Sequence, residues 1–465
     1  MFFNSVHFII FFSILFLIYN LLGLKQQNFL LLLASYFFYA YWDYRFLSLL
    51  ILCTCVSYFC GLLIYKAKND RSKKIFLIIN IILSLSVLFT FKYLNFFLAS
   101  TELFARIFGF SLKLPILNII LPLGISFFTF QSLSYPIDVF RGKLKATNNI
   151  LNYALYISFF PQLIMGPIER AGNLLPQFAR KREVNKDKFY SSLFLILSGY
   201  FKKTVIADHL EIYTSNFFNF IFGASTLDFI VMTIIYTIQV YYDFSGYIDI
   251  ARGIAGTLGF DLSMHFNKPF FAKNPVDFWR RWQISLAEWF RDYLFIPIAI
   301  PSIKKGYMYL PHIITMLLVG VWHGASYKFL IFGLYWGIFL VFYIHYRKYY
   351  DKLYIPLRII LTFCITCFSM LLSRIERISD LKHIWVNLSF SFYRTEIDNV
   401  LISVLAVAAL LLIIEGITLF KPTRKDYYKL LKSNSIVRYL SVFILIFIIV
   451  FYRAPEPFKF RYFLF

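Results

Sequence analysis

The run IFLIINIILSLSVLFTFKYLNFFL, residues 75–98, decides the fold class. Lys92 is its one charged residue, and the run exceeds the roughly 20 apolar residues that a helix needs to cross about 30 Å of hydrocarbon. A basic cluster directly precedes it, made of Lys66, Lys68, Arg71, Lys73 and Lys74. Because Lys and Arg gather in cytoplasmic loops, we predict a membrane-spanning helix that starts at the cytoplasmic side.

The same apolar pattern recurs along all 465 residues. Hydrophobic residues make up 60% of the chain and charged residues 15%, whereas soluble chains carry about 25% charged residues. The 58 phenylalanines would over-fill the core of a water-soluble protein of this size. About thirteen segments suit spanning or buried helices, among them residues 115–135, 151–165 and 329–346. We therefore expect an all-α integral membrane protein that forms a single polytopic domain over residues 1–465.

The charge balance fits this expectation. A net charge of +23 on a soluble chain would suggest nucleic acid, but here the basic residues stand at the ends of apolar segments. They are better explained by cytoplasmic loops and by contact with anionic membrane lipids, so no nucleic-acid partner is expected. Three apolar segments precede the basic loop at residues 66–74, which places the N-terminus outside. Counting onward from further basic loops places the tail after residue 453 outside as well.

Cysteines and metal ligands give no sign of a redox or metal centre. The five cysteines lie inside apolar runs: Cys53, Cys55, Cys60, Cys364 and Cys367. Polar loops would be expected for a disulfide framework or a zinc site. We expect neither, and no bound metal. The N-terminal MFFNSVHFIIFF lacks a basic start and a cleavage site, which is typical of a retained first helix.

Polar residues are concentrated between residues 239 and 323. The stretch includes Asp243, Ser245 and Asp249, followed by a Trp- and Arg-rich segment and then by His323 at the end of an apolar run. An ionisable residue within the membrane is a functional candidate by default, although a histidine there can also simply hydrogen-bond a backbone carbonyl. Gly320, three residues before His323, would permit close helix packing.

A buried histidine can do few kinds of chemistry here. Metal binding needs several ligands, and no His or Cys stands at helical ligand spacing from His323. A serine nucleophile would need a turn such as GxSxG, which the chain lacks. General base catalysis remains, in which neutral imidazole takes a proton from a hydroxyl group that attacks an activated acyl group. The residues alone do not identify the substrate.

Five ordered stretches carry a family resemblance. They are LPLGISFFTFQSLSYPIDVFRG (121–142), PQLIMGPIERAGNLLPQF (161–178), YYDFSGYIDIARG (241–253), FNKPFFAKNPVDFWRRWQISLAEWFRDYLFIP (266–297) and VWHGASYKFLIFG (321–333). With them the chain resembles the membrane-bound O-acyltransferase family, in the bacterial branch of alginate and peptidoglycan O-acetylation.

The resemblance implies a bundle of about 11–13 transmembrane or buried helices around a central funnel, with re-entrant and interfacial helices. Residues 111–346 would form the family core, between N-terminal helices at 1–110 and C-terminal helices with an extracytoplasmic tail at 347–465. It also implies that His323 is catalytic and that acetyl-CoA is the donor substrate on the cytoplasmic side, with no tightly bound cofactor.

Two positions depart from the branch's pattern. This chain has RWQISLA where the branch usually has RWHISLS, so Gln283 replaces a second histidine. Glutamine is no base at neutral pH, but its amide can hydrogen-bond an acyl carbonyl or orient His323. Trp336 stands where a third histidine is common.

The tail FRYFLF, residues 460–465, resembles an FxYFxF signature that a separate partner peptide carries in the teichoic acid system. The resemblance implies that Tyr462 relays the acyl group covalently as a third catalytic residue. An aromatic belt that anchors the last helix is the alternative reading.

Several further residues are candidates for substrate binding. Arg280, Arg281 and Lys273 could bind coenzyme A phosphates, or could anchor the chain at the membrane interface. Asp243 and Asp249 could pair with such arginines to hold the funnel walls. Ser245, Trp282 and Trp322 lie in the same motifs and complete the candidate set.

We therefore expect a multi-pass enzyme of the bacterial inner membrane, with periplasmic termini, that moves acetyl groups outward for O-acetylation of peptidoglycan. Alginate or another exopolysaccharide is the alternative acceptor. The expected partner is a periplasmic O-acetyltransferase. The rival classes are a polysaccharide or lipid-linked carrier without covalent chemistry and a non-catalytic scaffold. A carrier would favour interrupted helices in both halves of the chain, whereas the polar cluster lies in one stretch.

Overall fold

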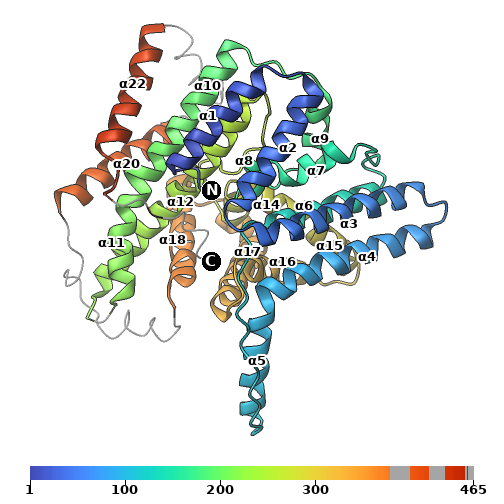
Figure 1. The fold of residues 1–465 in the computed structure, drawn as a ribbon. Helices are drawn as coiled ribbons and strands as arrows, with labels where there is room; N and C mark the ends of the chain where they lie inside the picture. Colours follow the sequence, from blue (N-terminus) through green and yellow to red (C-terminus); the bar gives the residue numbers. More distant parts are fainter. Residues whose placement is uncertain (222, 377–397, 418–434, 456–457, 459–465) are drawn as a thin grey trace. The chain divides into compact units, whose positions relative to one another are not determined.

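The computed structural model describes residues 1–221, 223–376, 398–417, 435–455 and 458, and all regular structure in these ranges is helical (Figure 1). The chain divides into two compact units. Unit 1 comprises Met1–Val184 and Ala255–Ser263, and unit 2 comprises Asn185–Ile254 and Met264–Phe465. The predicted divisions near residues 110 and 346 stay predictions.

Unit 1 contains the first helices of the chain, including a 3₁₀ turn (η1) and a π turn (η2). They are α1 (Val6–Asn20), α2 (Leu24–Ala40), η1 (Tyr44–Phe46), α3 (Leu47–Lys66), α4 (Asp70–Leu88), η2 (Phe89–Tyr93), α5 (Leu94–Ile107), α6 (Ile125–Phe140), α7 (Ile150–Ser158), α8 (Phe160–Leu163) and α9 (Ala171–Ala179).

Unit 2 contains the remaining helices, except that the last turn of α12 belongs to unit 1. They are α10 (Lys186–Tyr200), η3 (Phe201–Ala207), α11 (Asp208–Asn219), α12 (Thr226–Thr257), η4 (Pro269–Phe271), α13 (Pro275–Trp279), α14 (Ile284–Phe290), η5 (Arg291–Phe295), α15 (Ile296–Lys304), α16 (Leu310–His323), α17 (Tyr327–Tyr350), α18 (Ile355–Arg374), α20 (Asn399–Ile417) and α22 (Ser435–Phe451).

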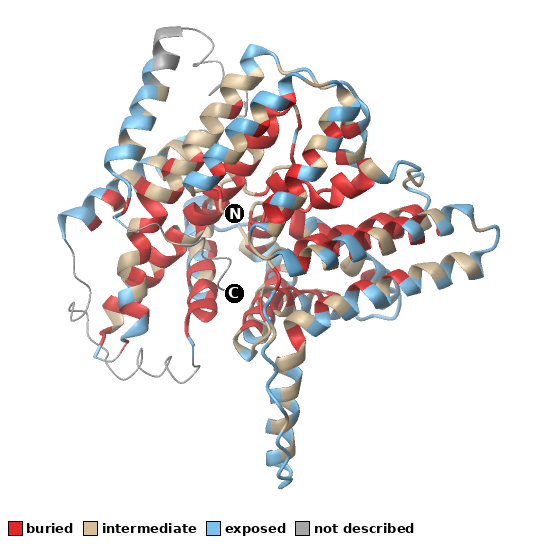
Figure 2. Cartoon of the chain, viewed as in Figure 1, coloured by how far each residue is buried: buried red, intermediate tan, exposed pale blue. Residues whose placement is uncertain are grey.

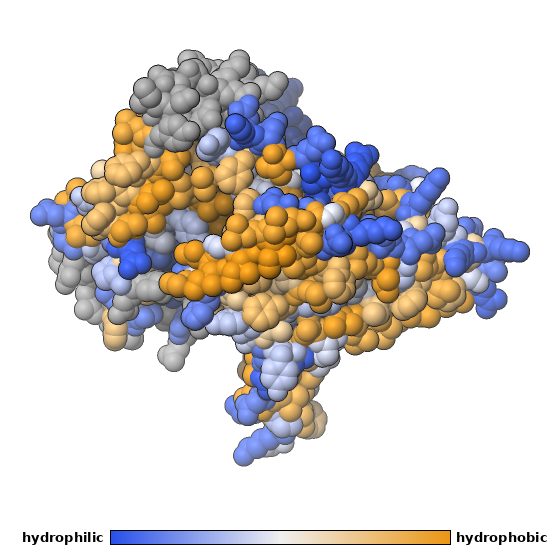
Figure 3. Space-filling model, turned by 45° about the horizontal axis from the view of Figure 1, so that its top comes forward, coloured by the Kyte–Doolittle hydropathy of each residue, from blue (hydrophilic) through white to orange (hydrophobic). Residues whose placement is uncertain are grey.

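The prediction of a multi-pass membrane protein is confirmed. Within the described ranges, six helical runs are long and apolar enough to span a bilayer: Tyr44–Lys66, Asp70–Ile107, Thr226–Thr257, Tyr327–Tyr350, Ile355–Arg374 and Asn399–Ile417. Large apolar side chains such as Ile10, Ile14 and Leu17 of α1 are exposed, and broad apolar patches cover the face shown in Figure 3. A lipid environment satisfies such a surface, whereas water would not.

The helix that decides the fold class starts and ends for identifiable reasons. The side chain of Asn69 caps α4 by accepting a hydrogen bond from the backbone N–H of Ser72. The π turn η2 then interrupts the helix before α5, which has no buried residue and extends away from α4 (Figures 1 and 2). A 19-residue α4 already approaches bilayer thickness, at about 1.5 Å per residue.

Two expected segments have different bounds. An apolar segment was predicted at residues 115–135, but the helix there, α6, begins only at Ile125, after Pro122 and the left-handed Gly124. The predicted segment at residues 151–165 is broken into α7 and α8 at Phe159. A proline normally disfavours the helical conformation in the residue before it. Pro161 is tolerated because it lies in the first turn of α8, where the missing backbone N–H breaks no hydrogen bond.

Helices α16 and α17 pack closely because of facing glycines. A Cβ atom on Gly320 of α16 would overlap the carbonyl oxygen of Phe329, and one on Gly333 of α17 would overlap the carbonyl oxygen of Met316. Small residues let two helix backbones approach in this way. The close packing fixes the C-terminal end of α16, which carries His323.

Candidate active site

The clearest site candidate is a pocket within unit 2, here called the His323 pocket. Four helices and one loop line it, with Tyr236, Val240, Asp243 and Phe244 from α12, Trp282 and Gln283 from the loop before α14, His323 from α16, Phe329 and Phe332 from α17, and Met370 and Ser373 from α18. The sequence predicted Asp243, Trp282, Gln283 and His323 as site residues, and the fold brings these four together. Their roles stay predictions.

His323 is the last residue of α16 and is partly buried. Its ring packs edge-on against Phe332 and Trp322, with centroid distances of 5.5 and 5.1 Å. The helix ends at this point because Gly324 adopts an extended conformation. The imidazole therefore lies at the end of α16, where aromatic packing holds it in the wall of the pocket.

Gln283 enters the pocket from a strained backbone. Its φ angle is 46°, in the left-handed region that costs an L-residue roughly 1–2 kcal/mol. Backbone hydrogen bonds on both sides hold the loop: Asn267 N–H donates to Arg281 O and Ile284 N–H donates to His265 O, each at 2.8 Å. The side chain is 3% exposed, and its amide oxygen has no hydrogen-bond partner among the described residues. A hydroxyl or amide N–H group is the kind of donor that this oxygen accepts a hydrogen bond from.

An aromatic stack supports this loop. Trp282 stacks on Phe278 and Phe278 stacks on Trp336, with centroid distances of 5.6 and 4.8 Å. Trp336 is fully buried. Trp336, which stands where a third histidine is common, is thus a packing residue. Through Phe278 it supports Trp282 in the wall of the pocket.

Sequence reasoning missed His265, which lies behind Gln283. Its side chain is 1% exposed, and its Nδ1 lies 2.9 Å from the hydroxyl oxygen of Ser285. Burial lowers the pKa of His265 to about 3, so the ring is neutral at physiological pH. No local pattern in MHFNK marks this histidine, since its partners come from α12 and α14.

The predicted pairing of the α12 aspartates is wrong in its partners. Asp243 and Asp249 bind lysines of η3 rather than arginines: Lys203 Nζ lies 2.7 Å from Asp243 Oδ1, and Lys202 Nζ lies 2.6 Å from Asp249 Oδ2. Facing Gly199 and Gly246 permit this approach, because a Cβ on Gly199 would lie 2.6 Å from the carbonyl oxygen of Gly246.

The remaining candidates lie outside the lining of the His323 pocket. Arg280 and Lys273 are exposed, and Arg281 is bound to Asp277, with Nε 2.9 Å from Oδ1. Ser245 and Trp322 are buried. They are close in sequence to residues that line the pocket, but they do not line it themselves. Tyr462 lies outside the described residues, so its predicted relay role stays a prediction.

Chemically, the pocket combines a nitrogen base, a neutral amide and a buried carboxylate between apolar walls. Imidazole can take a proton from a hydroxyl group, and an amide can hydrogen-bond the reacting carbonyl. No cluster of three or more His, Cys, Asp or Glu side chains suited to a metal ion occurs in the part of the chain that the structure describes.

Comparison with known proteins gives consistent matches. The model of the membrane-bound O-acyltransferase family matches residues 31–371. The probable alginate O-acetylase AlgI of Pseudomonas aeruginosa is 39% identical over 342 residues, which cover 73% of this chain and 65% of that protein. The peptidoglycan O-acetyltransferase of Helicobacter pylori is 37% identical over 340 residues, which cover 67% of this chain and 63% of that protein.

A more distant match is the teichoic acid D-alanyltransferase of Bacillus subtilis, 30% identical over 268 residues that cover 54% of this chain and 68% of that protein. The chain thus spans less than two thirds of the length of the Pseudomonas and Helicobacter relatives. The names of these relatives describe the transfer of an acetyl or D-alanyl group to alginate, peptidoglycan or teichoic acid.

Proposed function

The chain belongs to the membrane-bound O-acyltransferase family, and from this premise we propose that it transfers an acetyl group from acetyl-CoA to a hydroxyl group of an extracytoplasmic polysaccharide. One observation carries the proposal. His323 and Gln283, which come from two separate sequence motifs, line the same pocket of unit 2 together with a buried carboxylate.

In the proposed reaction the acceptor hydroxyl attacks the thioester carbonyl while His323 takes its proton. The carbon–oxygen bond forms, the negative charge collects on the carbonyl oxygen, and the amide N–H of Gln283 stabilises that charge. The intermediate then collapses, the carbon–sulfur bond breaks, and the imidazolium of His323 returns the proton to the coenzyme A thiolate. The products are an acetyl ester and free coenzyme A, so atoms and protons balance.

We propose cytoplasmic entry of the donor in an inner membrane, with both termini periplasmic. Coenzyme A is charged and hydrated, and it cannot cross about 30 Å of hydrocarbon, so only the acetyl group would pass outward. Peptidoglycan is the proposed acceptor, because nearly all bacteria contain it and few make alginate. The similarity to AlgI keeps alginate as the second candidate. The proposed partner is a periplasmic O-acetyltransferase that acts on the same polysaccharide.

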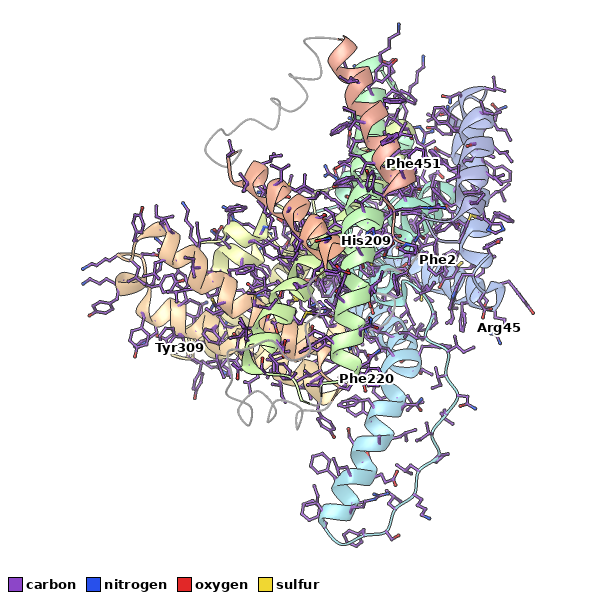
Figure 4. The ribbon with its side chains drawn as sticks, turned by 90° about the vertical axis from the view of Figure 1, so that its left-hand side faces the viewer. Phe2, Arg45, His209, Phe220, Tyr309 and Phe451 are labelled. Carbon is purple, nitrogen blue, oxygen red and sulfur yellow. The ribbon has the colours of Figure 1, made fainter. Side chains whose placement is uncertain are left out.

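The test replaces His323 with alanine in the host cell and measures base-labile acetyl esters in isolated peptidoglycan. His345→Ala is the matched control. His345 is an exposed histidine of α17 and does not line the pocket. Its Nδ1 lies 2.8 Å from the hydroxyl oxygen of Tyr309, which is labelled in Figure 4. We expect esters to disappear with His323→Ala and to persist with His345→Ala. Esters that survive His323→Ala would support a carrier or a scaffold instead.

A further inference from the structure

A buried ion-paired triad connects the His323 pocket to the neighbouring helices. Lys203 of η3 lies between two carboxylates, with Nζ 2.7 Å from Asp243 Oδ1 and 2.8 Å from Asp208 Oδ1. The side chains of all three residues are at most 4% exposed.

The two aspartates differ in one respect that matters for catalysis. Asp243 lines the His323 pocket, whereas Asp208 does not. The fold also fixes the position of Asp243 from its own helix. Gln239, four residues earlier and on the same face of α12, accepts a hydrogen bond from Thr214 Oγ1 at 2.6 Å and donates one to Glu211.

We propose that Asp243 is a positioning residue for the reaction at His323. This inference rests on the proposed function, because it assigns Asp243 a role in the step in which His323 gains a proton. The imidazolium that forms is costly in an apolar pocket, and a carboxylate fixed in the wall of the same pocket lowers that cost. Lys203, whose Nζ lies 2.7 Å from Asp243 Oδ1, holds the carboxyl group of Asp243 in place.

The size of the effect follows from electrostatics. A unit charge on the wall of a pocket with an effective dielectric constant of about 20 changes a rate by about 10- to 100-fold. The effect belongs to the proton-transfer step and not to donor binding, so kcat falls while KM for acetyl-CoA is unchanged.

The experiment compares Asp243→Asn with Asp208→Asn in the purified full-length protein in lipid nanodiscs. Each variant replaces one of the two aspartates that contact Lys203 with a neutral amide of similar size, so a purely structural role of the triad lowers the activity of both variants. Release of coenzyme A thiol from acetyl-CoA, with peptidoglycan fragments or alginate oligosaccharides as acceptors, gives kcat and KM. We expect kcat to fall about 10- to 100-fold with Asp243→Asn and by less than about 3-fold with Asp208→Asn. Equal losses in the two variants, or an unchanged kcat in Asp243→Asn, would overturn the proposal.

A double-mutant cycle separates this proposal from the proposed function. In a His323→Ala background, Asp243→Asn causes no further loss if Asp243 acts through His323. Independent, multiplying losses contradict the role of Asp243 alone, whereas wild-type activity of His323→Ala contradicts the proposed function itself. If Asp243→Asn does not fold, the double variant Lys203→Met, Asp243→Asn takes its place, because removing both partners of a buried ion pair is tolerated better than removing one.

Discussion

At the scale of single residues, the pocket is defined by side chains whose surroundings are unusual. Gln283 has a left-handed backbone and a buried amide oxygen, and His265 behind it is a buried neutral histidine. Such costly arrangements persist only where the surrounding structure enforces them. Both residues lie on the loop that the backbone bonds of Asn267 and Ile284 hold in place.

We predict that Gln283→Ala lowers kcat for acetyl transfer by about 100-fold, because a hydrogen-bond donor to the developing oxyanion is lost. Gln283→Asn is the matched variant, since asparagine keeps the amide and tolerates a left-handed backbone better than other residues do. It should retain more activity than alanine. An alanine variant as active as the wild type would show that the amide takes no part in the reaction.

His265 predicts a pH dependence of stability. The pKa of His265 is lowered from an ordinary value near 6.5 to about 3 in the folded protein, so the unfolded chain binds the proton first as the pH falls. Protonation of the unfolded chain therefore lowers the free energy of unfolding as the pH falls from 6.5 toward 3, whereas above pH 6.5 His265 causes no such loss. The free energy of unfolding should be about 2 kcal/mol lower at pH 5 than at pH 7.5 from this group alone.

The measurement is the unfolding midpoint in detergent at a series of pH values, for the wild type and for His265→Gln. The variant should show a weaker fall below pH 6.5, because glutamine does not titrate. The same slope in both proteins would mean that His265 is not the group responsible.

At the scale of elements, the position of His323 depends on how closely α16 and α17 pack. Gly320→Ala places a methyl group against the backbone of α17, and we predict a loss of about 1–3 kcal/mol in the free energy of unfolding together with reduced activity. Gly172→Ala is the control, because a Cβ on Gly172 in α9 would meet nothing within 4 Å. Differential scanning fluorimetry measures both. A Gly320→Ala protein as stable as the Gly172→Ala protein would contradict this packing.

The elements also show where sequence reasoning works and where it does not. Apolar run length was enough to predict spans such as α4 and α17, because hydrocarbon thickness fixes the length of a helix that crosses it. It did not predict the non-helical segment before Ile125, since residues 115–124 are as apolar as the helix that follows. Hydrophobicity reports the environment of a segment, not its conformation.

At the scale of the whole molecule, sequence motifs predicted which residues would meet. Gln283 and His323 were identified from their motifs, and the fold places both on one pocket. The partners of Asp243 and Asp249 were not predictable, because Lys203 and Lys202 lie 40 and 47 residues away from them in sequence. They approach α12 beside the close contact of Gly199 with Gly246. Contacts of this kind are set by helix packing, which no local pattern reveals.

The most direct test of the central claim is acetyl transfer by the purified protein reconstituted in lipid vesicles, with labelled acetyl-CoA as donor and peptidoglycan fragments as acceptor. Release of coenzyme A and label in the polysaccharide are measured for the wild type and for His323→Ala. The account predicts that the wild type transfers label and that His323→Ala is at least about 100-fold slower, because the general base is lost. Transfer by His323→Ala at the wild-type rate would contradict it.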